Sequence, residues 1–340
     1  MKVPKRPARY AIPFLILALA ACAVLIVFRS PLAPLLVGIP LSATTTPTTA
    51  ALPTELPSAG QLSPSASPAA AVITATPAGL CGFNAPMTIL LTGTSDAQGV
   101  SSAESIRVVR INPVEPAVKV LAFPRDVSAR TNVLQSASMP ESRLGLAYSY
   151  KKQITAGTER QQTVAATTVL AQVLYDNFGV TPDHYITVDL STWGQMIDAI
   201  GGVEVTLAEQ VTLANGETLQ AGTQRLNGRL AAAFIRFTDS GGEQDRLARQ
   251  NLIARALHKQ IRSGEIDINA GEFLARFHGA IVTDLSTQQM LSLDCLTGEI
   301  TENNVQFFEI DSAMVTVGTE GALIPDEAAV RALVDRVLNQ

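Results

Sequence analysis

Apolar and polar positions divide the chain into three parts. Residues 10 to 28 form an uninterrupted apolar segment, and a second apolar patch covers residues 32 to 41. A stretch of Thr, Pro, Ser and Ala then runs over residues 42 to 79 with a single charge, Glu55. From residue 80 onward, short apolar runs and amphipathic runs alternate. The pattern predicts one folded unit, residues 80 to 340, because the polar stretch before it cannot bury enough apolar surface to fold.

Strands and helices are predicted to alternate in the folded part. Runs rich in β-branched residues predict strands at 87–92, 106–111, 118–123, 185–188, 203–207 and 305–310. Apolar residues at helical spacing predict helices at 163–178, 192–200, 245–262, 270–277, 286–293 and 325–338. Residues 208–229 are predicted to form a loop and hairpin region. This alternation is typical of an α/β protein with helices on both faces of a sheet.

The apolar segment at the start decides where the folded unit lies. It has about the 20 residues that a helix needs to cross a bilayer, and residues 1 to 9 before it hold four basic residues and no acidic one. Basic flanks predict a cytoplasmic N-terminus. We therefore expect a cytoplasmic tail (1–9), a transmembrane anchor (10–41), an extended stalk (42–79) and an exported domain. A lipoprotein cleavage box at Leu19–Cys22 and a cleaved signal peptide remain alternatives.

Two cysteines lie in the folded part, Cys81 and Cys295. If this part faces an oxidising compartment, they are expected to form a disulfide that ties the start of the domain to its last third. The alternative is a pair of unpaired, buried thiols.

Charge and motifs exclude several functions. The net charge is −5, so nothing global favours nucleic acid as a partner. Three histidines lie far apart, in no spacing typical of a zinc site. The nucleotide-binding motifs G-x-x-x-x-G-K-[ST] and G-x-G-x-x-G are absent, as is the G-x-S-x-G of hydrolases. An anion site, if one exists, must be a local concentration of arginine.

Such a concentration occurs between Leu226 and Gln260. An apolar run over residues 230–237 carries Arg236, and a polar turn (238–242) leads into the predicted helix. That helix opens with Glu243 and Asp245, followed by three side chains that share one face: Arg246, Arg249 and Gln250.

The start of a helix favours an anion, because its backbone N–H groups are free and its dipole is positive there. Guanidinium groups bind phosphate through two parallel hydrogen bonds. The pattern indicates a phosphate or diphosphate site. The alternative is a solvated helix face whose arginines pair with Glu243 and Asp245.

Polar residues also gather at the ends of the first three predicted strands, where α/β proteins place their sites. They are Thr94, Ser95 and Asp96 after the first strand, Glu104 before the second, and Arg125 and Asp126 after the third. Carboxylates close to arginines suit a diphosphate bridged by Mg²⁺. The alternatives are an Arg125–Asp126 ion pair that closes a turn, and a turn-forming role for Asp96.

Several blocks of sequence, in order across about residues 85 to 262, resemble the LytR-CpsA-Psr (LCP) family. The blocks are Ala103–Ile106 with Val109–Pro113, Phe123–Val127, Asp183–Asp189, Ile197–Val203, Leu226–Gly228, and Arg236 followed by Arg246-x-x-Arg249-Gln250. The resemblance implies a single extracytoplasmic domain behind a transmembrane helix. Its fold is a mixed central sheet flanked by helices, with an apolar tunnel for a lipid tail.

The activity implied by the resemblance is that of a transferase. Such enzymes move a glycopolymer from a polyprenyl-diphosphate carrier to the cell wall, usually to peptidoglycan, through a phosphodiester. Carried over by position, Arg125, Arg236, Arg246 and Arg249 grip the diphosphate, with Gln250 beside them.

The acidic residues have roles by the same resemblance. Asp126, Glu243 and Asp245 accompany the substrate, and Asp96 and Glu104 hold Mg²⁺. Ser95 stands where the family usually has a metal-binding aspartate, Glu104 replaces a second aspartate, and Thr238 replaces an arginine. A second hypothesis is therefore a catalytically weak module that binds polyprenyl phosphate or diphosphate lipid, or wall glycan.

Overall fold

A computed structural model describes residues 80–340 except 84, 98–99, 138–140, 239–241 and 267–275. The predicted tail, anchor and stalk lie outside the described residues, as does most of the predicted helix 270–277. Among the helices that are described, none is long and apolar enough to cross a membrane.

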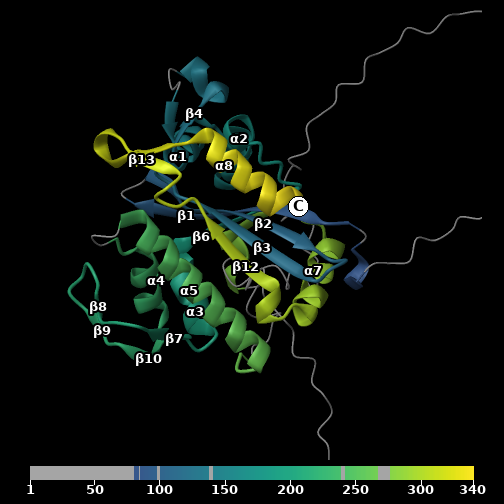
Figure 1. Ribbon diagram of the computed structural model, residues 1–340, viewed down its shortest axis with the longest axis vertical. Helices are drawn as coiled ribbons and strands as arrows, with labels where there is room; N and C mark the ends of the chain where they lie inside the picture. The colour runs from purple at the N-terminus through teal and green to yellow at the C-terminus, as the bar shows by residue number, and fades with distance from the viewer. Residues whose placement is uncertain (1–79, 84, 98–99, 138–140, 239–241, 267–275) are drawn as a thin grey trace, which may run out of the picture.

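A mixed sheet forms the centre of the described part (Figure 1). Its six strands are in the order β11-β6-β1-β2-β3-β12. Their bounds are β1 Met87–Ala97, β2 Val100–Asn112, β3 Ala117–Phe123, β6 His184–Asp189, β11 Ile281–Thr283 and β12 Val305–Glu309. Strand β1 pairs parallel with β6 and antiparallel with β2, and β3 pairs antiparallel with β2 and parallel with β12. The carboxyl ends of β1, β6, β3 and β12 therefore lie at one edge.

Helices cover both faces of this sheet. One face packs against α1 (Leu144–Ile154), α2 (Glu159–Phe178) and α8 (Glu327–Val334). The other packs against α3 (Leu190–Ala199), α4 (Gly228–Arg236), α5 (Gly242–Ser263) and α7 (Thr287–Glu299). Because apolar side chains of β1 alternate between the two cores, Leu90 and Ile89 are both fully buried on opposite faces.

Short paired strands lie outside the central sheet. They are β4 Ser128–Arg130 with β5 Glu141–Arg143, β7 Val203–Leu207 with β10 Gly222–Leu226, β8 Val211–Thr212 with β9 Thr218–Leu219, and β13 Val315–Val317 with β14 Leu323–Pro325. Short helical turns occupy Leu80–Gly82, Asn132–Ala137, His278–Ala280, Glu302–Asn304, Thr319–Gly321 and Asp335–Asn339.

Most predicted elements are confirmed with shifted ends, and the first two strands differ most. They extend toward each other into a long hairpin, so Thr94, Ser95 and Asp96 lie inside β1 and Glu104 lies inside β2. The expectation that these residues form loops at strand ends was wrong, and so was the turn-forming alternative for Asp96. Backbone pairing continues through polar side chains, because the ladder between Asp96 and Ser101 needs no apolar face.

The apolar run over residues 230–237 belongs mostly to helix α4. Asn227 caps this helix by accepting a hydrogen bond from the Leu230 backbone N–H at 2.9 Å. Gly228 lies directly on Gly194 of α3: a Cβ added to Gly228 would come within 1.7 Å of the Gly194 carbonyl oxygen. The Leu226–Gly228 block thus starts a helix and allows two helix backbones to touch.

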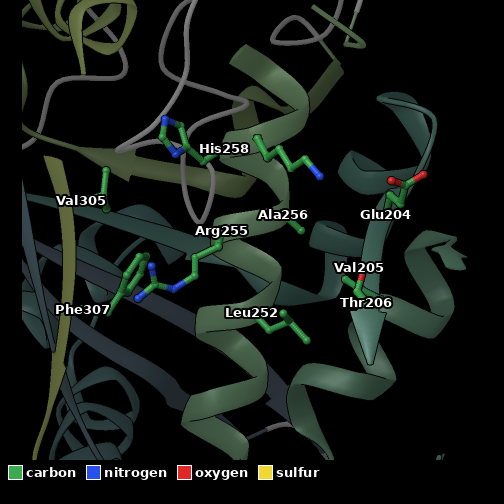
Figure 2. A pocket seen from close by; sticks show the side chains of 10 residues that line it. Glu204, Val205, Thr206, Leu252, Arg255, Ala256, His258, Val305 and Phe307 are labelled. Atoms are coloured by element: carbon green, nitrogen blue, oxygen red, sulfur yellow. The ribbon is translucent and has the colours of Figure 1, made fainter. Parts of the chain in front are cut away.

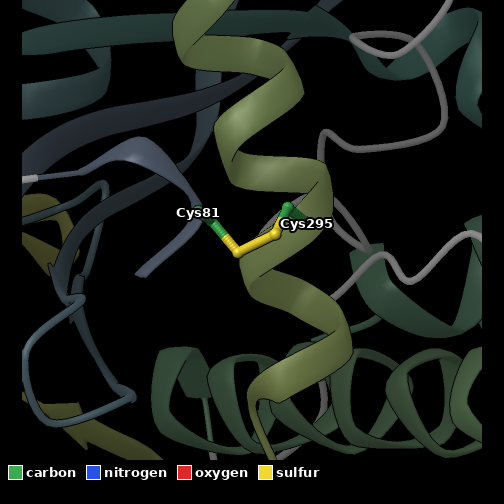
Figure 3. The surroundings of a disulfide bond; sticks show 2 residues. All are labelled: Cys81 and Cys295. Carbon is green, nitrogen blue, oxygen red and sulfur yellow. A yellow bond between two sulfur atoms is a disulfide. The ribbon is translucent and has the colours of Figure 1, made fainter. Parts of the chain in front are cut away.

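A disulfide joins Cys81 to Cys295, as Figure 3 shows. It links the turn that precedes β1 to helix α7, across a sequence separation of 214. The predicted pairing is confirmed, and the alternative of two unpaired thiols is wrong.

Candidate functional site

Arginines from distant parts of the sequence meet at the carboxyl edge of the sheet, on the face covered by α4 and α5. Arg125 follows β3 after Pro124, and helix α5 begins at the same edge with Glu243 and Arg246. The backbone N–H of Arg125 donates to Glu243 Oε1 at 3.3 Å, which joins the end of β3 to the first turn of α5. The sheet therefore brings together Arg125 and Arg246, which are 121 residues apart in the sequence.

Arg125 is held by carboxylates from two elements. Its Nη1 donates to Glu104 Oε2 of strand β2. Its Nε lies 3.6 Å from Asp126 Oδ2, and Arg143 Nη1 donates to Asp126 Oδ1 at 3.3 Å. The side chain of Arg125 remains 32% exposed, so solvent and ligands reach it. The predicted Arg125–Asp126 contact exists, but the hydrogen bond of the Arg125 side chain goes to Glu104.

Arg246 is buried rather than solvated, with 1% of its surface exposed. Its Nε donates to Glu243 Oε2 at 2.7 Å and its Nη2 to Glu243 Oε1, a two-point contact one turn apart on the helix. Its Nη1 donates to the Glu104 backbone carbonyl at 2.8 Å. The pairing with Glu243 is the one foreseen in the alternative reading, whereas the solvated helix face of that reading is wrong.

Two other predicted residues on α5, Arg249 and Asp245, differ in burial and in their contacts. Arg249 is 9% exposed, donates from Nη2 to the Phe237 carbonyl at 2.7 Å, and lies 5.0 Å from the Phe237 ring centroid. Asp245 is exposed and makes no hydrogen bond or ion pair with the residues that are described. Asp245 is therefore not brought into the arginine cluster.

Arg236 reaches the same edge from the end of α4. Its guanidinium Nη2 donates to the carbonyl of Leu190, the first residue of α3 after strand β6, at 2.8 Å. The residue is exposed to solvent. Leu190 in turn packs over Gly93 of β1, where an added Cβ would lie 3.1 Å from its side chain. Arg236 therefore lies beside the ends of β1 and β6.

Gln250 belongs to a buried polar cluster that sequence reasoning did not find. Its Oε1 accepts from Ser105 Oγ and from Arg107 Nη2, both at 3.2 Å. Arg107 is fully buried on β2, and its Nη1 donates to Asn251 Oδ1 at 2.6 Å. The signal was present in the sequence, because strand alternation places Arg107 on the same face as the apolar Val109 and Ile111.

Burial shifts the pKa values of two side chains in and beside this cluster. The pKa of Arg107 is lowered to about 10, first by burial and then by the nearby charge of Arg246, while Glu309 opposes the shift. The pKa of the Glu309 carboxyl, at the end of β12, is raised by burial and further by the charge of Asp311, while the charge of Arg107 opposes the shift. Arg107 still carries its charge at neutral pH.

The predicted Mg²⁺ ligands lie at separate positions of the β1–β2 hairpin. Glu104 is the extra residue of a bulge, because Gly93 pairs with Ser105 and Thr94 pairs with Ala103. Its carboxylate is bonded to Arg125, and Asp96 lies further along the hairpin, opposite Ser101. Within the described ranges, no three His, Cys, Asp or Glu side chains gather as metal ligands. Bound Mg²⁺ stays a prediction, and no step below depends on it.

A pocket of about 220 Å³ lies further along α5 (Figure 2). Helix α5, strand β7 and strand β12 line it with Glu204, Val205, Thr206, Leu252, Arg255, Ala256, His258, Lys259, Val305 and Phe307. Arg255 lies over the Phe307 ring, 4.4 Å from its centroid. The pocket begins at Leu252, two residues after Gln250, and shares no lining residue with the predicted site.

The fold and the site define a class: a mixed α/β protein with an arginine cluster where helix α5 begins at the carboxyl edge of its sheet. The model of the LytR_cpsA_psr family matches residues 65–337. The chain belongs to the LytR_cpsA_psr family.

Relatives of known name support this membership. The chain is 28% identical over 215 residues to the polyisoprenyl-teichoic acid–peptidoglycan teichoic acid transferase TagU of Halalkalibacterium halodurans, in a match that covers 61% of this chain and 64% of TagU. The chain thus spans less than two thirds of the length of this curated relative.

Two solved structures have a similar fold. B. subtilis TagV matches with a TM-score of 0.57 and 21% identity over 76% of this chain and 98% of TagV. The LytR-Csp2A-Psr enzyme from Actinomyces oris matches with a TM-score of 0.54 and 23% identity, over 74% and 89% of the two chains. At these identities the similarity shows the fold.

Proposed function

We propose that this chain is a cell-wall glycopolymer transferase, which moves a glycan phosphate from a polyprenyl-diphosphate carrier onto peptidoglycan. The observation that carries the proposal is the meeting of Arg125 and Arg246, bridged by Glu243, at the carboxyl edge of the sheet. The name of the relative TagU supports this substrate class.

The site suits phosphoryl transfer, which requires charge stabilisation and positioning more than a nucleophile on the protein. Arg125 and Arg236 are accessible and would bind the diphosphate oxygens directly. Arg246 and Arg249 are buried, so they would act by charge and by holding Glu243 and the Phe237 backbone in place.

In the proposed reaction, a hydroxyl oxygen of the acceptor forms a bond to the phosphorus that carries the glycan. The bond from that phosphorus to the bridging oxygen breaks, and polyprenyl phosphate leaves with the electron pair. The product is a phosphodiester between glycan and wall. The pocket between α5 and β12, with Leu252, Val305 and Phe307, offers apolar surface beside the helix that carries Arg246 and Arg249.

The proposed location is the outer surface of the cell membrane, with residues 10–41 as a single anchor and the N-terminus in the cytoplasm. The disulfide supports this location, because disulfides form and persist in oxidising compartments outside the cytosol. The carrier lipid is embedded in the same membrane.

Substitution of Arg246 tests the function. We expect Arg246→Ala to weaken binding of a polyprenyl-diphosphate-linked sugar by at least about tenfold and to abolish transfer. The substitution removes a buried positive charge and the charge-assisted hydrogen bonds, worth about 1.5–3 kcal/mol each, that hold Glu243 in place. Binding is measured by titration of the full-length protein in vesicles, and transfer by the release of polyprenyl phosphate.

The matched control is Arg229→Ala, an exposed arginine at the start of α4 that belongs neither to the arginine cluster nor to the pocket lining. Because Arg246 is buried, the unfolding free energy of the Arg246→Ala variant is measured as well. Arg246→Lys is a less disruptive variant that keeps the positive charge. Full transfer by Arg246→Ala would count against the transferase. Lipid binding without transfer by the unsubstituted protein would support the alternative of a binding module.

A further inference from the structure

The proposed reaction releases a proton, because the acceptor hydroxyl loses its hydrogen when its oxygen attacks phosphorus. Most carboxylates around the arginine cluster are poorly suited to accept it. Glu104 is bonded to Arg125, Glu243 to Arg246, and Asp126 to Arg143. An adjacent positive charge stabilises the ionised carboxylate and so weakens it as a base.

Glu309 is different. It ends β12, where its register partner is Ala122 of β3, and Ala122 is also the register partner of Arg107 on β2. The three residues form one row on the α5 face of the sheet, and the small Ala122 leaves Arg107 and Glu309 facing each other across it. Glu309 is half-buried, so solvent reaches it, and it makes no ion pair with any residue that is described.

A chain of hydrogen bonds connects Glu309 to the arginine cluster. Asn251 Nδ2 donates to Glu309 Oε2 at 3.5 Å, and Asn251 Oδ1 accepts from Arg107 Nη1 at 2.6 Å. Arg107 Nη2 then donates to Gln250 Oε1, one turn of α5 after Arg246. Asn251 therefore hydrogen-bonds to the Glu309 carboxylate, and Arg107 fixes the orientation of Asn251 through its other amide atom.

We propose that Glu309 is the general base of the transfer, and that Arg107 is a positioning residue that acts on it through Asn251. The proposal rests on the transferase function. Glu309 takes the proton of the acceptor hydroxyl as its oxygen bonds to phosphorus and polyprenyl phosphate leaves, and the carboxyl then returns the proton to solvent. A general base of this kind contributes about 10²- to 10⁴-fold to the rate.

The test uses the full-length protein in vesicles, with polyprenyl-diphosphate-linked N-acetylglucosamine as donor probe and peptidoglycan fragments as acceptor. We expect Glu309→Gln to lower kcat by about 10²-fold or more while donor binding stays within about twofold. Formate, a small carboxylate, is expected to restore part of the rate to Glu309→Ala. The matched control is Glu115→Gln, an exposed carboxylate in the turn between β2 and β3, with kcat unchanged within about twofold.

Arg107 is tested by the pH dependence of kcat. The charge of Arg107 lowers the pKa of Glu309. Removing that charge in Arg107→Met is therefore expected to raise this pKa and to move the acid limb of the kcat profile to higher pH. A purely structural role would lower the amount of folded protein without this movement. Asn251→Ala, a smaller disruption, is expected to lower kcat with KM unchanged.

The outcomes separate this proposal from the function on which it rests. If the unsubstituted protein transfers glycan, Arg246→Ala does not, and Glu309→Gln keeps full kcat, the base assignment is wrong and the transferase stands. Absence of rescue by formate also counts against the base. If the unsubstituted protein binds donor but never transfers, both proposals fall together.

Discussion

At the scale of single residues, the interior near the site is unusual in holding charged and polar groups that apolar neighbours surround. Arg107 is fully buried, and its Nη1 and Nη2 donate to oxygens on α5, while its Nε has no hydrogen-bond partner among the described residues. The nitrogens of Arg246 donate to Glu243 and to a backbone carbonyl. Burial of such groups is tolerated because their hydrogen bonds are retained, and each lost partner would leave a costly unpaired group.

His258 allows a prediction on pH and stability. It is 4% exposed, and its pKa is lowered to about 4, first by burial and then by the charge of Arg262, while a hydrogen bond to the Ile300 backbone opposes the shift. Above the unfolded pKa of about 6.5, the imidazole is neutral in both states. As the pH falls from there toward 4, the unfolded chain binds a proton that the native protein does not, so stability is lost.

We expect the unfolding free energy to fall on the order of 2 to 3 kcal/mol from this residue between pH 7 and pH 4. His258→Gln is expected to remove that part of the slope. Urea unfolding at several pH values measures it, with Lys259→Gln, the exposed neighbour, as the control that keeps the original slope. An unchanged slope in His258→Gln would contradict the assignment.

At the scale of elements, the packing of α3 on α4 sets the position of Arg236. Gly194 and Gly228 bring the two helix backbones into contact, and the carboxylate of Asp198 accepts from the Gly228 backbone N–H at 2.7 Å. Because α4 starts at this contact and ends at Arg236, the guanidinium reaches the Leu190 carbonyl only while the crossing is close. Small residues at a crossing are thus a requirement of the site as well as of the core.

Gly228→Ala is expected to destabilise the protein by about 3 kcal/mol, because overpacked sites cost about 1–3 kcal/mol or more and the added Cβ meets backbone that cannot rotate away. The Cβ would lie 1.7 Å from the Gly194 carbonyl oxygen. Thermal and urea unfolding measure the loss. Gly279→Ala, where nothing lies within 4 Å of an added Cβ, is the control and is expected to change stability by less than about 0.5 kcal/mol. Equal stability of the two variants would overturn the close-contact argument.

At the scale of the whole molecule, the chain closes on itself through the disulfide and through the sheet. Cys81 precedes β1 and Cys295 lies in α7, so the bond links the two ends of a loop in which most of the domain is contained. Strand β12, from the last part of the chain, completes the edge of the sheet beside β3 and brings Glu309 to the site. The proposed active site thus depends on residues from both halves of the domain.

Cys81→Ser with Cys295→Ser is expected to lower the free energy of unfolding by about 2–5 kcal/mol, because the cross-link restricts the unfolded chain. Reductant should lower the melting temperature of the unsubstituted protein to about that of the double variant. Reductant should have no effect on the melting temperature of the double variant. Peptide mass mapping under non-reducing conditions checks the pairing. A melting temperature that is insensitive to reductant would contradict a stabilising bond.

Local patterns in the sequence were sufficient to predict the class of fold, the main strands and the ends of helices such as α2, because apolar periodicity and a terminating glycine are local signals. Gly179 ends α2 in a left-handed conformation, as the pattern indicated. The sequence also identified Arg125, Arg236 and Arg246 as candidates for the site, since their motifs occur in the same order as in the family.

The contacts that these residues make depend on the folded arrangement of the chain. Three contacts depend on strand register and sheet order: Glu104 pairs with Arg125, Arg246 donates to the Glu104 carbonyl, and Arg107 and Glu309 face each other across Ala122. The last two of these contacts join residues more than a hundred positions apart, and no local pattern encodes them. The physical reason is that a sheet edge collects side chains by topology, and topology is fixed by the packing of the whole chain.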